Sequence, residues 1–251
     1  MRHFKFLALV AAAMMFAGGN TSNAAEFTDA QKGEIGTIVR DYLLKNPEVL
    51  QEVSAQLQQK QAAQQEKHAG DAIKQNASDI FRSTTDHSAG NVKGDVTVVE
   101  FFDYNCPYCK RSYPTINSLI QGDNKVRVVM KEFPILGAGS VFASRAAIAA
   151  IQQGKYWPLH EALMAVQGKV DEARVMTIAK QVGLDTDRLT KDMKSESVTA
   201  AINKNNELAQ KLGINGTPAF IIGDQLSPGA IELADMQSRV AQVRANSCAV
   251  C

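Results

Sequence analysis

The sequence predicts an α/β protein in which a long helical insertion divides a small sheet, and three observations support this expectation. A β-branched and aromatic run at 96–102 precedes a helical stretch and a second apolar run at 126–131. Residues 140–212 then show helical patterns throughout. Two short segments around Gly223-Asp224 complete the pattern as a hairpin, followed by a last helix. Layers of helices on a sheet accommodate this order of elements.

The first 24 residues have the layout of a secretory signal peptide. Arg2 and Lys5 form a basic start, and an apolar run covers 6–17. Small residues at positions 22 and 24 then precede the expected cleavage after Ala24 or the next residue. The alternative is a membrane anchor, but the run is shorter than the roughly 20 apolar residues that a span requires. No later segment is long and apolar enough to cross a membrane. We therefore expect an exported protein.

The composition is that of an ordinary globular protein, with 45% hydrophobic and 21% charged residues among 251. Cleavage after Ala24 removes two basic residues, so 27 Lys and Arg become 25 against 26 Asp and Glu. This near-neutral balance gives no excess of basic charge with which to bind nucleic acid or an anionic membrane surface. The length permits one full-sized domain and a smaller appendage.

Residues 26–90 are expected to form this appendage. A helix is predicted over Thr28–Lys45, and Asn46-Pro47 restarts a second helix that loses its pattern in the Gln-, Lys- and Ala-rich stretch 58–67. Residues 86–94, with two glycines, are expected to be a linker. The apolar positions at helical spacing are Ile35, Ile38, Val39, Tyr42 and Leu43, then Leu50, Val53 and Leu57. Such a thin stripe must lie on the main domain, pair with another chain, or stay partly disordered.

Residues 91–247 are expected to form one compact domain, with its helical insertion at about 140–212. The expected strands are 96–102, 126–131, 219–222 and a short segment around Leu226. The expected helices are 107–121, 142–153, 157–166, 171–182, 186–212 in one or two pieces, and about 229–245. This order is that of a thioredoxin-like core split by a helical cap.

The four cysteines form two Cys-x-x-Cys pairs, Cys106/Cys109 and Cys248/Cys251. The first pair stands where a strand meets a helix, so the N–H groups and dipole of the helix would stabilise a Cys106 thiolate. Pro107 suits the first helical turn. Cys109, one turn later, is close enough to close or resolve a disulfide. We therefore predict that Cys106 is the nucleophile and Cys109 the resolving thiol.

Two other uses of Cys106 and Cys109 are disfavoured. A structural disulfide across so short a loop would remove little chain entropy. A zinc ribbon needs its second pair roughly 15–20 residues away, whereas most of the domain separates Cys109 from Cys248. No histidine lies near either pair in the sequence, and we expect neither a metal nor a cofactor.

The segment Glu100–Lys110 resembles the active-site segment of the DsbA family of bacterial disulfide oxidoreductases. Gly216–Phe220 resembles the cis-proline loop of that family, and Trp157–His160 a segment of its helical insertion. With the leader and residues 26–90, the chain resembles the DsbA-like group that includes ScsC. The resemblance covers about residues 26–245 and implies a periplasmic enzyme that oxidises or isomerises disulfide bonds in exported proteins.

The resemblance implies roles for three further residues. Pro218 would be cis and face the disulfide, while Thr217 would offer backbone hydrogen bonds to a substrate strand; a trans turn proline is the alternative. Glu100 would be the buried carboxylate beneath the cysteines, able to exchange a proton with Cys109 if burial raises its pKa. A solvent-facing strand glutamate is the alternative.

The resemblance also bears on redox direction and partners. A strong oxidant of this family has His before its second Cys, whereas Tyr108 adds no charge, and Thr217 before the proline resembles the isomerase and reductase branch. We expect shuffling as well as oxidation. The implied partners are unfolded or misfolded exported proteins and a membrane oxidase or reductase. Residues 26–80 are expected to join protomers into a homodimer or homotrimer, with a helical hairpin on its own domain as the alternative.

The terminal pair Cys248/Cys251 departs from the family pattern, because a helix and no strand precedes it. It fits a labile disulfide, a second redox couple, a Cu(I) site or an inert tail. The alternative function for the whole chain is a periplasmic chaperone or copper-binding thiol protein without turnover. A peroxide-reducing enzyme has less support, because no Thr or Arg pattern for peroxide activation stands near Cys106.

Overall fold

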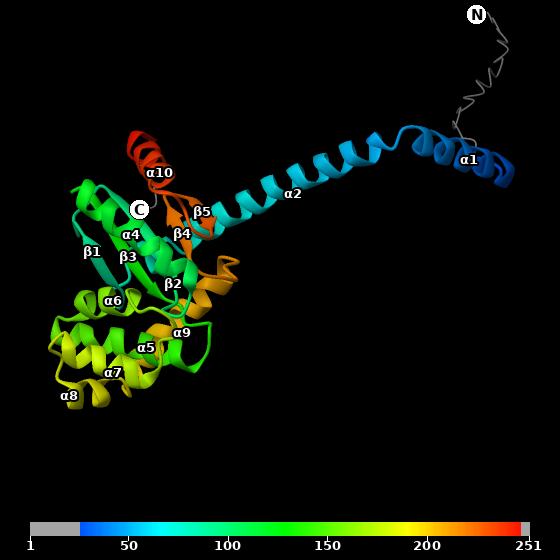
Figure 1. Cartoon of the computed structure of the whole chain (residues 1–251). Coiled ribbons are helices and arrows are strands. Elements are labelled where there is room, and N and C mark those ends of the chain that lie inside the picture. The colour runs from blue at the N-terminus through cyan, green and yellow to red at the C-terminus, as the bar shows by residue number, and fades with distance from the viewer. Residues whose placement is uncertain (1–25, 247–251) are drawn as a thin grey trace, which may run out of the picture. The chain divides into compact units, whose positions relative to one another are not determined.

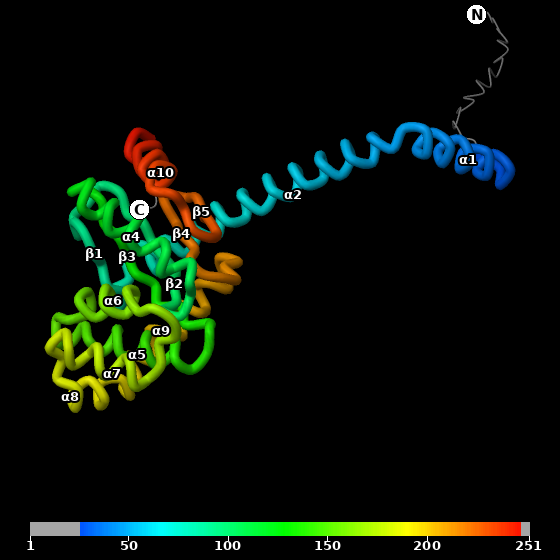
Figure 2. The backbone as a smooth tube through the Cα atoms, viewed as in Figure 1, coloured from blue at the N-terminus to red at the C-terminus, as the bar shows by residue number. Residues whose placement is uncertain are grey.

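The computed structural model describes residues 26–246, so the predicted signal peptide and Cys248/Cys251 lie outside it. The described chain forms two compact units, residues 26–57 and 58–246, and the division falls within one long helix. Figure 1 labels the elements, and Figure 2 follows the backbone alone.

The N-terminal unit consists of α1 (Asp29–Lys45) and the first part of α2 (Glu48–Gln75). Thr28 and Gln31 form a reciprocal capping box that starts α1. No residue of α1 is buried, and its apolar side chains Ile38, Val39 and Tyr42 are at least half exposed. The apolar stripe predicted from the sequence is therefore a free surface in the single chain.

The prediction that the second helix loses its order around 58–67 is wrong. α2 continues through this stretch to Gln75, because Ala, Gln and Lys are all good helix formers and no proline or turn residue interrupts them. Its last turns are anchored by Ile73, which is fully buried in the second unit. The short helix α3 (Ala77–Phe81) follows directly.

The second unit contains a five-stranded sheet in the order β1-β3-β2-β4-β5. Its strands are β1 (His87–Gly90), β2 (Val96–Phe102), β3 (Val126–Glu132), β4 (Ala219–Ile222) and β5 (Gln225–Pro228). β2 and β3 are parallel, and every other neighbouring pair is antiparallel. β4 and β5 form the predicted hairpin, with Gly223-Asp224 between the paired Ile222 and Gln225.

Helices cover both faces of the sheet, so β2 is buried along its whole length. Val98 and Phe102 face α4 (Pro107–Gly122) and α10 (Leu233–Asn246) in one apolar cluster. Val99 and Phe101 face the end of α2, α3 and α9 (Glu196–Lys211) in a second cluster. The alternation of side chains along β2 therefore decides which residues lie beneath α4.

The predicted helical insertion lies between β3 and β4 and comprises five α-helices in the described chain. It contains α5 (Ala138–Ala150), α6 (Tyr156–Met164), α7 (Glu172–Gln181) and α8 (Thr186–Asp192) before α9. α5 contacts each of the other four, and its small side chains at Ala143, Ala146 and Ala147 permit this close packing. Figure 1 shows α5 to α8 gathered at one end of the sheet.

The prediction of a linker at 86–94 is wrong for its first half, because His87–Gly90 is strand β1, paired with β3. His-Ser-Ala-Gly has little intrinsic strand preference, so the pairing with β3 determines its conformation. The two glycines permit close approach of backbones: a Cβ on Gly90 would lie 2.7 Å from the Val126 carbonyl oxygen, and one on Gly94 only 2.4 Å from that of Lys125.

A buried ion pair ties the segment before β1 to the sheet. The Lys131 ammonium contacts the Asp86 carboxylate and donates to the Asp79 carbonyl, and both charged side chains are almost fully buried. Asn205 of α9 also donates to Asp86, at 3.1 Å. Burial lowers the pKa of Lys131, and the Asp86 charge opposes this shift.

We predict that Asp86→Ala destabilises the folded chain by about 3–5 kcal/mol, because it leaves the Lys131 ammonium buried without a counter-charge. Lys204→Ala, which breaks the half-exposed pair with Asp79, should cost under about 1 kcal/mol. Urea unfolding of the two variants measures both values. Equal small losses would show that the buried pair does not hold this segment.

Candidate active site

The predicted strand-to-helix junction is present, and it places Cys106 at the N-cap of α4. The backbone of Cys106 is extended (φ −75°, ψ 116°), and Pro107 occupies the first helical position. The Cys106 sulfur accepts a hydrogen bond from the Cys109 N–H at 3.3 Å. Both cysteines are free thiols, and little of either is exposed. A thiolate at this position faces the unpaired N–H groups of the first turn.

These surroundings lower the pKa of Cys106 to about 5. The largest cause is a hydrogen bond from the Cys109 thiol, followed in the same direction by the Thr217 side chain and the N–H groups of Cys109 and Tyr108. Burial opposes the shift, since it penalises the charged form. Cys106 is therefore a thiolate at neutral pH.

Cys109 has the opposite character. It is fully buried on α4, and burial is the main cause that raises its pKa far above the ordinary range. Its hydrogen bond to Cys106 and the nearby Glu100 charge act in the same direction. One thiol of the pair is thus activated while its partner keeps its proton, as a nucleophile and a resolving thiol require.

The Thr217–Pro218 peptide bond is cis, as the family resemblance of this loop implies, and the trans alternative is wrong. This loop precedes β4, and β4 pairs with β2, so the sheet brings it to the cysteines. The Thr217 carbonyl oxygen lies 3.2 Å from the Cys106 sulfur and accepts from its protonated form. The Pro218 carbonyl accepts from the Gly229 N–H at 2.8 Å, which ties the loop to the end of β5.

Glu100 lies in the middle of β2 and is only 2% exposed, which contradicts the solvent-facing alternative. Its register partners are Met130 and Phe220, and its side chain lies on the face that α4 covers. Burial raises the pKa of Glu100 to about 8, and the charge of Cys106 adds to the shift. Its Oε1 atom has no hydrogen-bond partner within the described part of the chain. The structure therefore places a buried carboxyl group with a raised pKa near the cysteine pair.

Asp103, which no sequence pattern singled out, fixes the turn between β2 and Cys106. One carboxylate oxygen of Asp103 accepts from the Asn105 N–H and the Ser140 hydroxyl, each at 2.7 Å. The other accepts from the N–H groups of Ile135 and Leu136 at 2.8 and 2.9 Å. An aspartate in a turn is a recognisable signal, but three of its four partners, Ile135, Leu136 and Ser140, lie more than 30 residues away in the chain.

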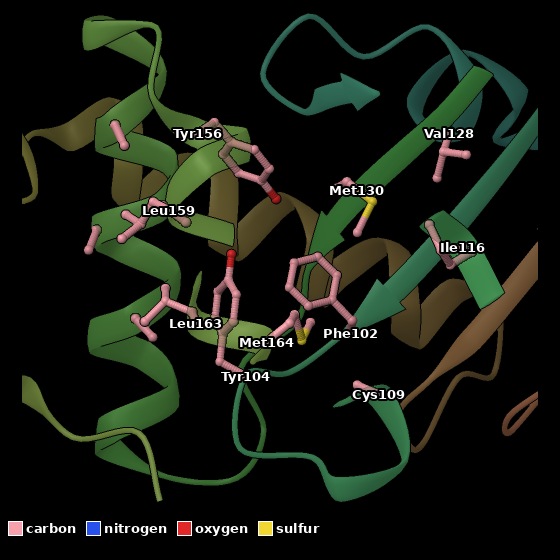
Figure 3. Close-up of a cluster of buried hydrophobic side chains, with 14 of the residues drawn as sticks. Phe102, Tyr104, Cys109, Ile116, Val128, Met130, Tyr156, Leu159, Leu163 and Met164 are labelled. Atoms are coloured by element: carbon pink, nitrogen blue, oxygen red, sulfur yellow. The ribbon is translucent and has the colours of Figure 1, made fainter. Parts of the chain in front are cut away.

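A second buried carboxylate, Glu132 at the end of β3, was also missed. It accepts hydrogen bonds from the hydroxyls of Tyr104, Tyr156 and Ser144 at 3.0, 2.8 and 2.6 Å. The Tyr104 hydroxyl also lies 3.1 Å from Nδ1 of His160. Figure 3 shows the two tyrosine rings directing their hydroxyls toward the same point between the sheet and the helical insertion. Tyr104 stands two residues before Cys106.

The arrangement supports thiol–disulfide exchange at the two cysteines. It combines an activated thiolate, a protonated partner thiol one turn away and a buried acid, with a backbone carbonyl beside the reacting sulfur. Within residues 26–246, no group of three or more His, Cys, Asp or Glu side chains is arranged to hold a metal ion.

Two family models match separate parts of the chain. The model described as the DSBA-like thioredoxin domain matches residues 97–241, which include every site residue considered above. The model described as the copper resistance protein ScsC N-terminal domain matches residues 31–64. The second match falls on α1 and the first part of α2.

Solved structures show the same relationship. A thioredoxin-like oxidoreductase from Silicibacter pomeroyi DSS-3 is 50% identical, covering 67% of this chain and 97% of its own, with a TM-score of 0.66. A linker-deletion mutant of Proteus mirabilis ScsC is 28% identical, covering 89% of this chain and 99% of its own, with a TM-score of 0.67.

Curated relatives cover less of the chain. The Na(+)/H(+) antiporter NhaA 3 of Salinispora tropica is 29% identical over 157 residues, or 62% of this chain, which spans only 24% of that relative. The probable disulfide bond formation protein D of Bacillus cereus is 26% identical over 167 residues, or 61% of this chain and 77% of its own length. No helix of this chain between residues 26 and 246 is long and apolar enough to span a membrane. The matched domain, with its Cys106-Pro107-Tyr108-Cys109 site, shows that the chain belongs to the DsbA-like thiol–disulfide oxidoreductase family.

Proposed function

We propose that this chain is a periplasmic enzyme that oxidises and isomerises disulfide bonds in exported proteins through Cys106 and Cys109. The observation that carries the proposal is that the pKa values of the two neighbouring thiols are shifted in opposite directions. The pKa of Cys106 is lowered to about 5, and the pKa of Cys109 is strongly raised. The signal-peptide pattern of residues 1–24 supports export.

In the oxidising direction, a client thiolate attacks the Cys106 sulfur of the Cys106–Cys109 disulfide. The bond to Cys109 breaks, Cys109 leaves with the electron pair, and a mixed disulfide joins Cys106 to the client. A second client thiolate then attacks the client sulfur and releases Cys106 as a thiolate. Two electrons pass from client to enzyme, and a membrane oxidase would restore the enzyme disulfide.

In the isomerising direction, the Cys106 thiolate attacks a client disulfide and forms the mixed disulfide. Another client thiolate displaces Cys106, so the client changes its pairing without net oxidation. This direction requires a reduced enzyme, which a membrane reductase would maintain. The pair is suited to it because the thiolate form of Cys106 predominates at neutral pH.

Glu100 is proposed to exchange the proton of Cys109. A thiol with a raised pKa leaves and attacks poorly unless a neighbouring group supplies or accepts its proton. Glu100 is buried beside Cys109 and has a pKa of about 8, so both of its protonation states are accessible near neutral pH. Cys109 would take the proton when it leaves and return it when it attacks.

An open groove beside the site offers room for a client chain. It has a volume of about 1260 Å³ and starts at Thr217 and Pro218, next to the Cys106 sulfur. The hairpin strand β5, the start of α10 and the α2 residues from Ala62 onward form its walls. A client held by a mixed disulfide at Cys106 would have its flanking residues at this groove.

We further propose that the N-terminal unit joins protomers into a dimer or trimer. Along residues 35–57, eight large apolar side chains are more than 40% exposed. Exposed apolar surface of this extent is typical of a site that binds another protein. The eight residues are Ile35, Ile38, Val39, Tyr42, Leu44, Leu50, Val53 and Leu57. An oligomer would present several Cys106 sites to one misfolded client.

Turnover should depend on Cys106. The mature protein should reduce insulin and refold scrambled ribonuclease, and Cys106→Ala should abolish both activities because it removes the nucleophile. Full activity in Cys106→Ala would refute an enzymatic role for this cysteine. Stoichiometric Cu(I) binding without any turnover would favour the chaperone or copper-binding alternative.

The lowered pKa of Cys106 should depend mainly on its hydrogen bond with Cys109. Titration of the reduced protein by ultraviolet absorbance should show Cys106 half ionised near pH 5 and Cys109 protonated throughout the neutral range. Cys109→Ala should raise the pKa of Cys106 toward its ordinary value, whereas Cys109→Ser, which retains a donor, should raise it less. Equal pKa values in the two variants would contradict the hydrogen bond as the main cause.

Assembly should depend on the apolar side chains of the N-terminal unit. Analytical ultracentrifugation should find the mature protein as a dimer or trimer, and Leu57→Glu should shift it to monomer because it places a charge in the apolar stripe. Gln58→Glu adds the same charge at the adjacent residue and should leave the assembly intact. A wild-type monomer would overturn the proposal. Deletion of residues 26–80 is an unsuitable test, since Ile73 and Ile80 are core residues of the second unit.

A further inference from the structure

The buried group around Glu132 has no part in the exchange mechanism described above, yet it directly contacts the active-site turn. Glu132, Tyr104, Ser144, Tyr156 and His160 are each at most 2% exposed. They come from β3, the turn before Cys106, α5 and α6, so one carboxylate joins the sheet to both helices and to the turn. Figure 3 shows Tyr104 and Tyr156 approaching each other from opposite sides.

The set of hydrogen bonds that this group forms depends on whether Glu132 is protonated. Tyr104 has a single hydroxyl hydrogen but two neighbours, Glu132 at 3.0 Å and Nδ1 of His160 at 3.1 Å. With Glu132 ionised, Tyr104 donates to the carboxylate and accepts from an Nδ1–H of His160. With Glu132 protonated, Tyr104 can donate to a bare Nδ1 instead. The bond that holds the turn to β3 is therefore charge-assisted in only one of the two states.

We propose that Glu132 is a positioning residue whose ionised form, through Tyr104, holds the turn at residues 103–106 in the geometry in which Cys106 reacts fastest. This role rests on the proposed function of Cys106. It differs from that of Glu100, because Glu132 acts through the placement of the turn and exchanges no proton with the cysteines.

Other groups near Glu132 do not account for a titration in the neutral range. Burial lowers the pKa of His160 to about 3, so His160 stays neutral, and burial raises the pKa values of Tyr104 and Tyr156 far above that range. His87 stacks on Tyr156 with ring centroids 4.3 Å apart, and burial lowers its pKa. The Asp103 charge helps to raise the pKa of Glu132, after burial as the main cause, to about 8.

The fluorescence of Trp157 can report on the protonation of Glu132. Trp157 is the only tryptophan, and its ring stacks on His160 with centroids 5.2 Å apart. A change in the protonation of Glu132 alters the hydrogen bonds of His160 and therefore the surroundings of the indole. Emission from Trp157 thus reports on the protonation, while the reaction of Cys106 with a small disulfide reports on the turn.

The test uses the full mature chain in a Glu100→Gln background, which removes the other buried carboxyl with a pKa of about 8. Between pH 6 and pH 9.5 the rate of Cys106 with oxidised glutathione should rise about fivefold, the factor separating a hydrogen bond to a charged acceptor from one to a neutral acceptor. Trp157 emission should change over the same interval. Adding Glu132→Gln, which retains the shape but cannot ionise, should abolish both changes.

Two tyrosine variants separate positioning from general destabilisation. Tyr104→Phe and Tyr156→Phe each remove one hydroxyl from the same Oε1 atom of Glu132. Tyr156→Phe should retain the rise in rate and the Trp157 titration, whereas Tyr104→Phe, which removes the hydroxyl that joins Glu132 to His160, should lose both. A rate rise that survives Glu132→Gln, or identical behaviour of the two tyrosine variants, would overturn the proposal. Because glutathione is a small reagent, this result is independent of whether the chain turns over client proteins.

Discussion

The whole site depends on the position of the Cys106 sulfur at the N-cap of α4. There the sulfur accepts from the Cys109 N–H at 3.3 Å and lies 3.2 Å from the Thr217 carbonyl, so the helix and the cis-proline loop meet at one atom. The sheet makes this possible, because β2 leads into the turn before Cys106 and pairs with β4, which follows Thr217 and Pro218. The free energy that stabilises the thiolate is therefore supplied by the fold itself.

The buried charged groups serve different purposes on the two faces of the sheet. On the face covered by α2, α3 and α9, Lys131 is matched by Asp86, and removal of either charge would leave the other unpaired. On the face covered by α4 and the helical insertion, Glu100 and Glu132 have no cationic partner among residues 26–246. Burial leaves each of them with a pKa near neutrality, where a paired carboxylate would be permanently ionised.

Much of the fold and the central site could be predicted from the sequence because those signals are local. A few neighbouring residues are enough to predict the structure in three places: the strand at 96–102, the Cys-x-x-Cys pair and the turn at Gly223-Asp224. β1 was missed because its residues have no strand preference and depend on pairing with β3. The Glu132 group was missed because Tyr104 and His160 are 56 residues apart and meet only after the insertion folds onto the sheet.

The reduction potential of the Cys106–Cys109 pair tests the account most directly, since a stabilised thiolate favours the reduced form. A Cys106 pKa of about 5 lies between about 7 in thioredoxin and about 3.5 in DsbA, so the potential should fall between about −270 and about −120 mV. Equilibration of the mature protein with glutathione buffers measures it. A value at either limit would contradict the account, because it would require a thiolate environment unlike the one around Cys106.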